Sequence, residues 1–268
     1  MQNRSFASNL GIYAYAAGAI FLGLLGLASG DFATTWQRVG PNVPLRAPLA
    51  YLTAFIELAA GLALLWRRTA RAGALTLTVV YSVFTLLWVP QALVNLGDYN
   101  SIGNVFEEFS LVAAGLVLYA ILSPAGSSIA RLQPFFALLF GICPISFGIV
   151  HIVDMPGLLG AIPGWLPPAR MFWAYTTTLG FFGAAVAILT GILAPLASRL
   201  LIAETLIFEL LFWIPQLPAG LHNHFIWSGN AISIAISGAI WVVSDSICQA
   251  AKRTPAHTES ATGVSTHA

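Results

Sequence analysis

Charged side chains are scarce in this chain of 268 residues. Only 8% of its residues are charged and 58% are hydrophobic, whereas a water-soluble domain carries about 25% charged residues. The formal net charge is +1 and no basic patch is present, which excludes nucleic acid as a partner. A surface of this composition cannot face water on all sides, so we expect a lipid bilayer to surround it.

Cysteine and cofactor motifs are equally scarce. The two cysteines, Cys143 and Cys248, form no Cys-x-x-Cys pair and have no histidine at zinc-binding spacing, so no metal site is predicted. The chain also has no Gly-rich dinucleotide motif and no histidine pair spaced for haem within a hydrophobic run. A cofactor therefore stays unknown, and a redox centre would have to come from a partner protein.

Long hydrophobic runs are what the chain has in abundance. A helix needs about 20 apolar residues to cross the hydrocarbon layer, and helices satisfy their own backbone polar groups in lipid. Eight runs meet this requirement, at 10–28, 47–66, 72–94, 103–122, 134–153, 172–193, 199–217 and 225–243. The pattern predicts an all-α, polytopic membrane protein with eight transmembrane helices.

The second half of the chain repeats the first. Trp88-Val89-Pro90-Gln91 recurs as Trp213-Ile214-Pro215-Gln216, and other matches share an offset of about 124 residues. We therefore predict a first four-helix unit over 1–122, a linker over 123–132, a second unit over 133–247 and a disordered cytoplasmic tail over 248–268. Because each unit has an even number of helices, the two form parallel repeats, each a four-helix bundle.

The distribution of Lys and Arg predicts the orientation. If the N-terminus is cytoplasmic, eight of the 11 Lys and Arg residues lie inside, and only Arg38, Arg46 and Arg170 lie in outer loops. This bias predicts a multi-pass protein of the inner (plasma) membrane with both termini cytoplasmic.

Two glutamates are predicted in the middle of the membrane. Glu57 and Glu209 each lie about ten residues, or roughly 15 Å, from the end of a span. The repeat places Phe181 opposite Glu57 and Thr85 opposite Glu209, so neither acid has a twin. Acids at this depth are candidates for catalysis, and if the two lie close they could share one proton. The alternative is structural, with each protonated acid donating one hydrogen bond to a carbonyl.

A second group of candidates lies toward the predicted outer surface. His151 and Asp154 are three residues apart and share a helix face, so the carboxylate could orient the imidazole as a catalytic base. Glu107 and Glu108 are candidate binding residues. Both are expected to open the fourth helix, where the helix dipole gives acids a structural reason to be.

The remaining candidate binding residues come from the repeated motif and the last outer loop. Trp88, Gln91, Trp213 and Gln216 belong to the motif, whose structural alternative is that each glutamine bonds carbonyls freed by the adjacent proline. His222 and His224 lie in the last outer loop, without metal-ligand spacing.

Several stretches of both units resemble the DoxX-like family of integral membrane proteins. They are F-G-I-V-H at 147–151, I-P-G-W-L-P at 162–167 and F-W-A-Y at 172–175, with A-Y-L-T at 50–53, R-A-G-A-L at 71–75 and N-V-F-E at 104–107. The resemblance implies a tandem duplication of a four-helix unit, and some members of the family are subunits of quinone-linked redox systems. Ser29 takes the place of His151 in the first unit, so equivalent sites in both units are not expected.

Three functions follow as hypotheses. The first is an accessory subunit of a membrane redox system that binds a quinone or lipid-like substrate and works with a redox partner protein. The second is a membrane enzyme, of isomerase or cyclase type, that acts on an isoprenoid-like lipid by carboxylate acid/base chemistry. The third is a transporter or a lipid-organising scaffold.

Overall fold

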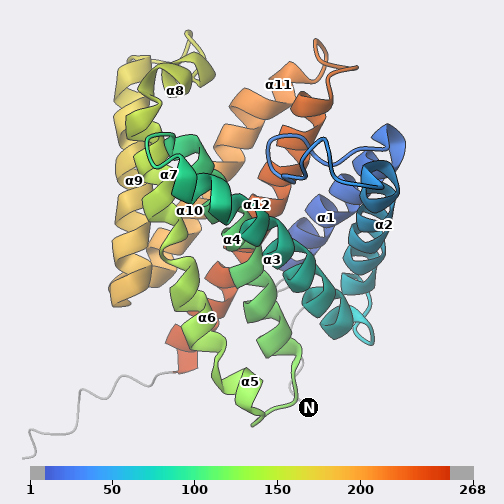
Figure 1. Cartoon of the computed structure of the whole chain (residues 1–268). Helices are drawn as coiled ribbons and strands as arrows, with labels where there is room; N and C mark the ends of the chain where they lie inside the picture. Colours follow the sequence, from blue (N-terminus) through green and yellow to red (C-terminus); the bar gives the residue numbers. More distant parts are fainter. Residues whose placement is uncertain (1–9, 254–268) are drawn as a thin grey trace, which may run out of the picture.

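The computed structural model describes residues 10–253, and this part of the chain is built of helices without any strand (Figure 1). Seven helical segments in it are long and apolar enough to cross a membrane. They are α1 (Leu10–Ser29), α2 (Arg46–Leu64), α3 (Ala70–Val94), α4 (Tyr99–Leu122), the pair α6 (Gln133–Phe140) and α7 (Cys143–Val153), α9 (Arg170–Thr190) and α12 (His224–Arg253). The prediction of an all-α polytopic membrane protein is confirmed.

The eighth expected span, at 199–217, is helical but interrupted. It consists of α10 (Ala194–Phe208), the single π-helical turn η2 (Glu209–Trp213) and the short α11 (Ile214–Gln216). In η2 the backbone N–H of Ile214 bonds the carbonyl of Glu209, five residues back. Pro215 follows and has no N–H to offer the preceding turn. This interruption is why seven candidate spans are found within residues 10–253 where eight were expected.

The first span of the second predicted unit is also broken. α6 ends at Phe140, α7 begins at Cys143, and the N–H groups of Gly141 and Ile142 bond carbonyls only three residues back. Pro144 in the first turn of α7 cannot donate to the end of α6. The corresponding helix of the first unit, α1, is continuous.

Two short helices mark the opposite ends of the bundle. α5 (Ser128–Arg131) lies within the predicted linker at one end, and α8 (Met155–Ala161) lies at the other, near α11 (Figure 1). We call these ends the α5 end and the α8 end. The start of α1 and the end of α12 both lie toward the α5 end (Figure 1).

The helices of the two predicted units are interlocked. α1 packs most extensively against α12, the last helix of the second unit, and then against its neighbour α2. In the same way α4 packs against α6 and α7, and it also contacts α12. In each predicted unit, the first helix thus packs against the last helix of the other unit. The division into units at 123–132 stays a prediction.

Glycines allow α1 and α12 to approach this closely. A Cβ added to Gly238 would overlap the backbone of Ala14 and Tyr15, and one added to Gly18 would overlap Ala235. Small residues at such crossings bring helix backbones into direct contact, which is how helices gain packing energy in lipid.

Several predicted boundaries differ from the structure, among them the start of α4 and the end of α12. α4 begins at Tyr99 rather than 103, because the Asp98 side chain caps it by accepting a hydrogen bond from the Asn100 backbone N–H at 3.2 Å. α12 continues to Arg253, so the first six residues of the expected disordered tail are helical. The rest of that tail, 254–268, lies outside the described residues.

Candidate functional site: a cavity beside α4

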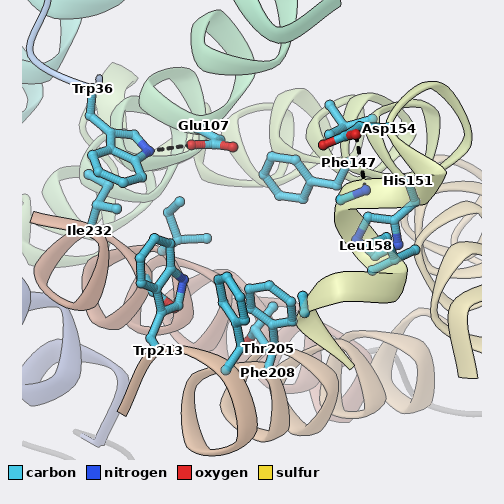
Figure 2. Close-up of a pocket in the computed structure, with 16 residues that line it drawn as sticks. Trp36, Glu107, Phe147, His151, Asp154, Leu158, Thr205, Phe208, Trp213 and Ile232 are labelled. Atoms are coloured by element: carbon cyan, nitrogen blue, oxygen red, sulfur yellow. Dashed lines mark hydrogen bonds between the residues drawn. The ribbon is translucent and has the colours of Figure 1, made fainter. Parts of the chain in front are cut away.

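A cavity of about 410 Å³ lies between the two predicted units (Figure 2). Its walls come from α4, α7, α8, α10, η2 and α12, and from one residue of the connection between α1 and α2. The lining residues are mainly aromatic and aliphatic, with few polar groups. They are Trp36, Glu107, Phe147, Val150, His151, Asp154, Gly157, Leu158, Ala161, Thr205, Phe208, Phe212, Trp213, Ile232, Ser233 and Ile236. Four predicted site residues therefore meet here: Glu107, His151, Asp154 and Trp213.

Glu107 is held by a tryptophan at one end of the cavity. The indole Nε1–H of Trp36 donates to Glu107 Oε2 at 2.6 Å, and Figure 2 shows this bond beside the open space. The other carboxyl oxygen of Glu107 has no hydrogen-bond partner among the described residues. This oxygen is therefore available to a ligand.

The prediction that Glu107 and Glu108 lie at the start of the fourth helix, where its dipole would stabilise them, is wrong. Because α4 begins at Tyr99, both acids lie more than two turns inside the helix, and the dipole effect is confined to the first turn. The two adjacent acids also point to different surroundings. Glu107 faces the cavity, whereas Glu108 is completely buried and neither of its carboxyl oxygens has a partner.

His151 and Asp154 line the cavity at its opposite end. The His151 ring packs edge-on against Phe181 at 5.0 Å, and its Nδ1 lies 3.5 Å from the Thr177 hydroxyl. Asp154 caps α8, since its Oδ1 accepts the backbone N–H of Gly157 at 3.1 Å. The expected interaction between the His151 and Asp154 side chains is not formed, because the Asp154 carboxylate accepts a backbone hydrogen bond from α8 instead.

Aromatic rings form the wall next to Glu107. The Trp213 ring packs edge-on against the Trp36 ring at 6.0 Å, and Phe225 stacks on Trp36 at 5.6 Å with an interplanar angle of 19°. Trp213 can lie flat against α12 because Gly229 has no side chain there. The second tryptophan of the repeated motif therefore belongs to the cavity wall.

The first tryptophan of the motif holds the segment that carries Trp36. Trp88 Nε1 donates to the carbonyl of Trp36 at 2.7 Å, and the Arg38 guanidinium lies 4.9 Å above the Trp88 ring. Arg38 also donates to Gln91 Oε1 at 2.9 Å. The structural interpretation of the motif expected Gln91 to bond the carbonyl freed by Pro90. Instead, Gln91 binds the segment that carries Trp36.

Glu57 lies outside the cavity, in the interior of the first unit. Its Oε1 accepts a hydrogen bond of 2.6 Å from Gln37 Nε2, and both side chains are buried. Glu108, Tyr15 and Tyr81 lie close enough to Glu57 to interact with it electrostatically. Glu57 is thus grouped with residues of its own unit.

Glu209 lies in the second unit, in the π-helical turn. It is buried, and Ser233 on the cavity wall lies near it without reaching hydrogen-bonding geometry. η2 packs against α12, whereas α2 packs against α1 and α3. The possibility that Glu57 and Glu209 share one proton is therefore not realised, because they occupy different parts of the molecule.

The other candidates have structural contacts. Gln216 donates to the carbonyl of Phe212 at 3.1 Å, four residues back. His224 Nε2 lies 2.9 Å from the carbonyl of Phe32, so the start of α12 contacts the α1–α2 connection. His222 is exposed. Within residues 10–253, no group of three His, Cys, Asp or Glu side chains is placed to hold a metal ion.

Sequence reasoning missed three residues of the site. Trp36 and Gln37 lie in the irregular connection between α1 and α2 and were not among the predicted site residues. Thr205 is the third, and a signal for it was present. At the repeat offset of 124 it corresponds to Tyr81, a fully buried side chain in the first unit. Thr205, which has the smaller side chain, lines the cavity.

The arrangement of the cavity suits a flat, mostly apolar molecule. Its rings offer stacking surfaces, and Glu107 and His151 offer hydrogen bonds at two separated points. Apolar walls with a few convergent polar groups are typical of small-molecule sites.

Comparisons with models of known protein families, with curated proteins and with solved structures found no match for this chain. The resemblance to the DoxX-like family therefore rests on sequence motifs alone.

Proposed function

We propose that this protein binds the ring of a quinone-like lipid in the cavity beside α4, as the quinone-interacting subunit of a membrane redox system. The observation that carries the proposal is the pairing of a free carboxyl oxygen of Glu107 and the imidazole of His151 with aromatic walls. A quinone ring carries two oxygens on opposite sides, which matches two separated polar groups. The DoxX-like resemblance supports the same assignment.

In this proposal the redox centre belongs to a partner protein, and the protein lies in the inner membrane with both termini cytoplasmic. The Lys and Arg bias supports this orientation, and the start of α1 and the end of α12 at the same end of the bundle are consistent with it. The α8 end and the cavity near it then lie toward the outer leaflet.

Filling the cavity tests the proposal without changing any charge. Thr205→Tyr introduces the side chain that the first unit already has at the corresponding position. We expect it to weaken binding of a decyl-substituted benzoquinone at least tenfold, which is about 1.4 kcal/mol, because the tyrosine ring would occupy space that the ligand needs. Binding is measured by quenching of tryptophan fluorescence in the purified protein, because Trp36 and Trp213 line the cavity.

Thr176→Tyr is the matched control. Thr176 is exposed on α9 and does not line the cavity, so the same side chain there should leave binding unchanged. If the wild type and Thr205→Tyr bound the benzoquinone equally well, the cavity would be ruled out as the binding site. Equal rates of quinone reduction in membranes with and without the protein would remove the redox role.

The enzyme hypothesis gains less from the structure. Of its four candidate catalytic residues, His151 and Asp154 line the cavity, whereas the mid-membrane acids Glu57 and Glu209 do not.

A second candidate function, transport of a small solute, is favoured by one observation. Two helices next to the cavity are discontinuous: α6–α7 at Gly141 and the α10–η2–α11 segment at Glu209. Discontinuous helices are where transporters bind their substrates. Uptake of a labelled solute into vesicles that contain the purified protein, compared with empty vesicles, separates transport from quinone binding.

A further inference from the structure

We propose that Glu57 is a positioning residue that acts on the cavity from outside it, by holding Trp36 against Glu107. The positioning itself is a statement about contacts within the chain. Its consequence for ligand binding rests on the proposed function.

Glu57 is connected to the cavity through Gln37, the sequence neighbour of the lining residue Trp36. Trp36 lines the cavity, and its neighbour Gln37 points the other way, into the interior of the first unit. The Gln37 amide is fixed at both of its polar atoms: Nε2 donates to Glu57 at 2.6 Å and Oε1 accepts the Ala33 backbone N–H at 3.0 Å. Glu57 therefore ties the backbone that carries Trp36 to the middle of α2.

The Glu57–Gln37 bond is one of several side-chain contacts that hold the segment 36–38. Trp88 holds the carbonyl of Trp36, and Arg38 bonds Gln91 where water can reach. Water replaces an exposed hydrogen bond at little cost, whereas an unpaired buried group costs much more. Glu57 and Gln37 are both buried, and the Trp88 bond is buried as well, so solvent can replace neither of these two contacts.

The position of Trp36 decides what a ligand meets. Its N–H occupies Glu107 Oε2, which leaves the other carboxyl oxygen for the ligand, and its ring forms the wall together with Trp213. A shift of the segment would move this wall and release Glu107 at the same time.

The proposal also explains why the second unit has no acid at the position that corresponds to Glu57. The connection between α7 and α9 in the second unit contains no glutamine that could act as Gln37 does: its Trp165 is exposed, and Trp173 of α9 bonds the carbonyl of Pro167. At the position that corresponds to Glu57, Phe181 packs against Phe147 and His151. The first unit thus supplies the support for a cavity that lies mostly in the second.

The test follows the indole N–H of Trp36 directly. In protein labelled with ¹⁵N-tryptophan in detergent micelles, Trp36→Phe identifies its NMR signal, which reports the bond to Glu107 whether or not a ligand is present. Glu57→Leu and Gln37→Leu remove the anchor, and both should shift this signal. We also expect them to weaken decyl-benzoquinone binding about tenfold, the size of a lost buried hydrogen bond. Glu57→Gln keeps an acceptor oxygen for Gln37 and should preserve the signal and the affinity within about twofold.

Glu108→Leu is the matched control, since it removes a buried carboxyl from the same interior that makes no bond to residues 36–38. Its Trp36 signal should stay in place. An unshifted signal in Gln37→Leu, which alters a connection residue and leaves α2 intact, would overturn the proposal. So would loss of quinone binding in Glu57→Gln with an unshifted signal, because the carboxyl would then act in another way. Shifted signals with unchanged quinone affinity would keep the positioning role and count against the proposed function.

Discussion

At the scale of single residues, the buried acids of this protein differ in whether they have a hydrogen-bond donor. Glu57 and Glu107 each accept a bond of 2.6 Å, from Gln37 and from Trp36. Glu108 and Glu209 are buried without a partner for either oxygen. A buried polar group without a partner costs about 1–3 kcal/mol, so the two kinds of acid should respond in opposite ways to replacement.

We expect Glu108→Leu to leave the melting temperature unchanged or to raise it, because the change removes an unpaired buried carboxyl and keeps the volume. Glu57→Leu should destabilise the protein by about 1–3 kcal/mol, since it leaves the buried Gln37 amide without its acceptor. Thermal unfolding of both variants in the same detergent measures the difference. An equal loss of stability in the two variants would contradict this account of Glu108.

The sequence predicted these acids better than their partners. Depth along a hydrophobic run sufficed to select Glu57 and Glu209, because helical rise is regular. Gln37 and Trp36 lie in an irregular connection, where no periodicity indicates which way a side chain points. Gly97-Asp98 before an apolar run was a usable start signal for α4, and reading it would have removed the dipole explanation for Glu107 and Glu108.

At the scale of helices, the contact between α1 and α12 depends on the absence of side chains at a few positions. Gly238→Ala should cost about 1–3 kcal/mol, because the added methyl group would overlap the α1 backbone, which cannot move aside as a side chain can. Thermal unfolding measures this cost. Gly183 on α9 has open space around it, so Gly183→Ala should be neutral or gain up to about 1 kcal/mol of helix stability. A Gly238→Ala protein as stable as Gly183→Ala would show that the crossing is less tight than described.

The same motif produces different backbones in the two units, which the sequence could not indicate. Pro90 lies inside the continuous helix α3, whereas Pro215 follows a π-helical turn. The difference comes from tertiary contacts: Trp213 packs on Gly229, and its carbonyl accepts a bond from Asn230 on α12 at 3.3 Å. Local sequence predicts that a proline weakens the helix, but the neighbouring helix decides how the turn is rearranged.

At the scale of the whole molecule, the first helix of each predicted unit packs against the last helix of the other. Neither unit alone therefore has all of its packing partners. We expect the two halves, separated within Ser123–Gly126, to be unstable when each is expressed alone and to co-purify when they are expressed together. Capture through an affinity tag on one half measures the association. Gly238→Ala in the second half should weaken it, because that residue lies at the α1–α12 contact. A first half that is folded and monodisperse alone would contradict the interlocked arrangement.

Composition and hydrophobic runs predicted the membrane class and nearly all of the spans, because these depend only on length and polarity. The interlocking could not be predicted, since every helix of both units presents small residues and the sequence does not say which pairs of faces meet. The cavity depends on that pairing, because α4 from one unit and α7, α10 and α12 from the other form its walls.

The contact between α1 and α12 has a consequence for biosynthesis. A ribosome delivers α1 to the membrane well before α12, so the glycines of α1 that face α12 have no partner until α12 has been translated. A nascent chain released before that point lacks the neighbour that α1 packs against most extensively. Synthesis of α12 is therefore the step that allows α1 to reach its native packing.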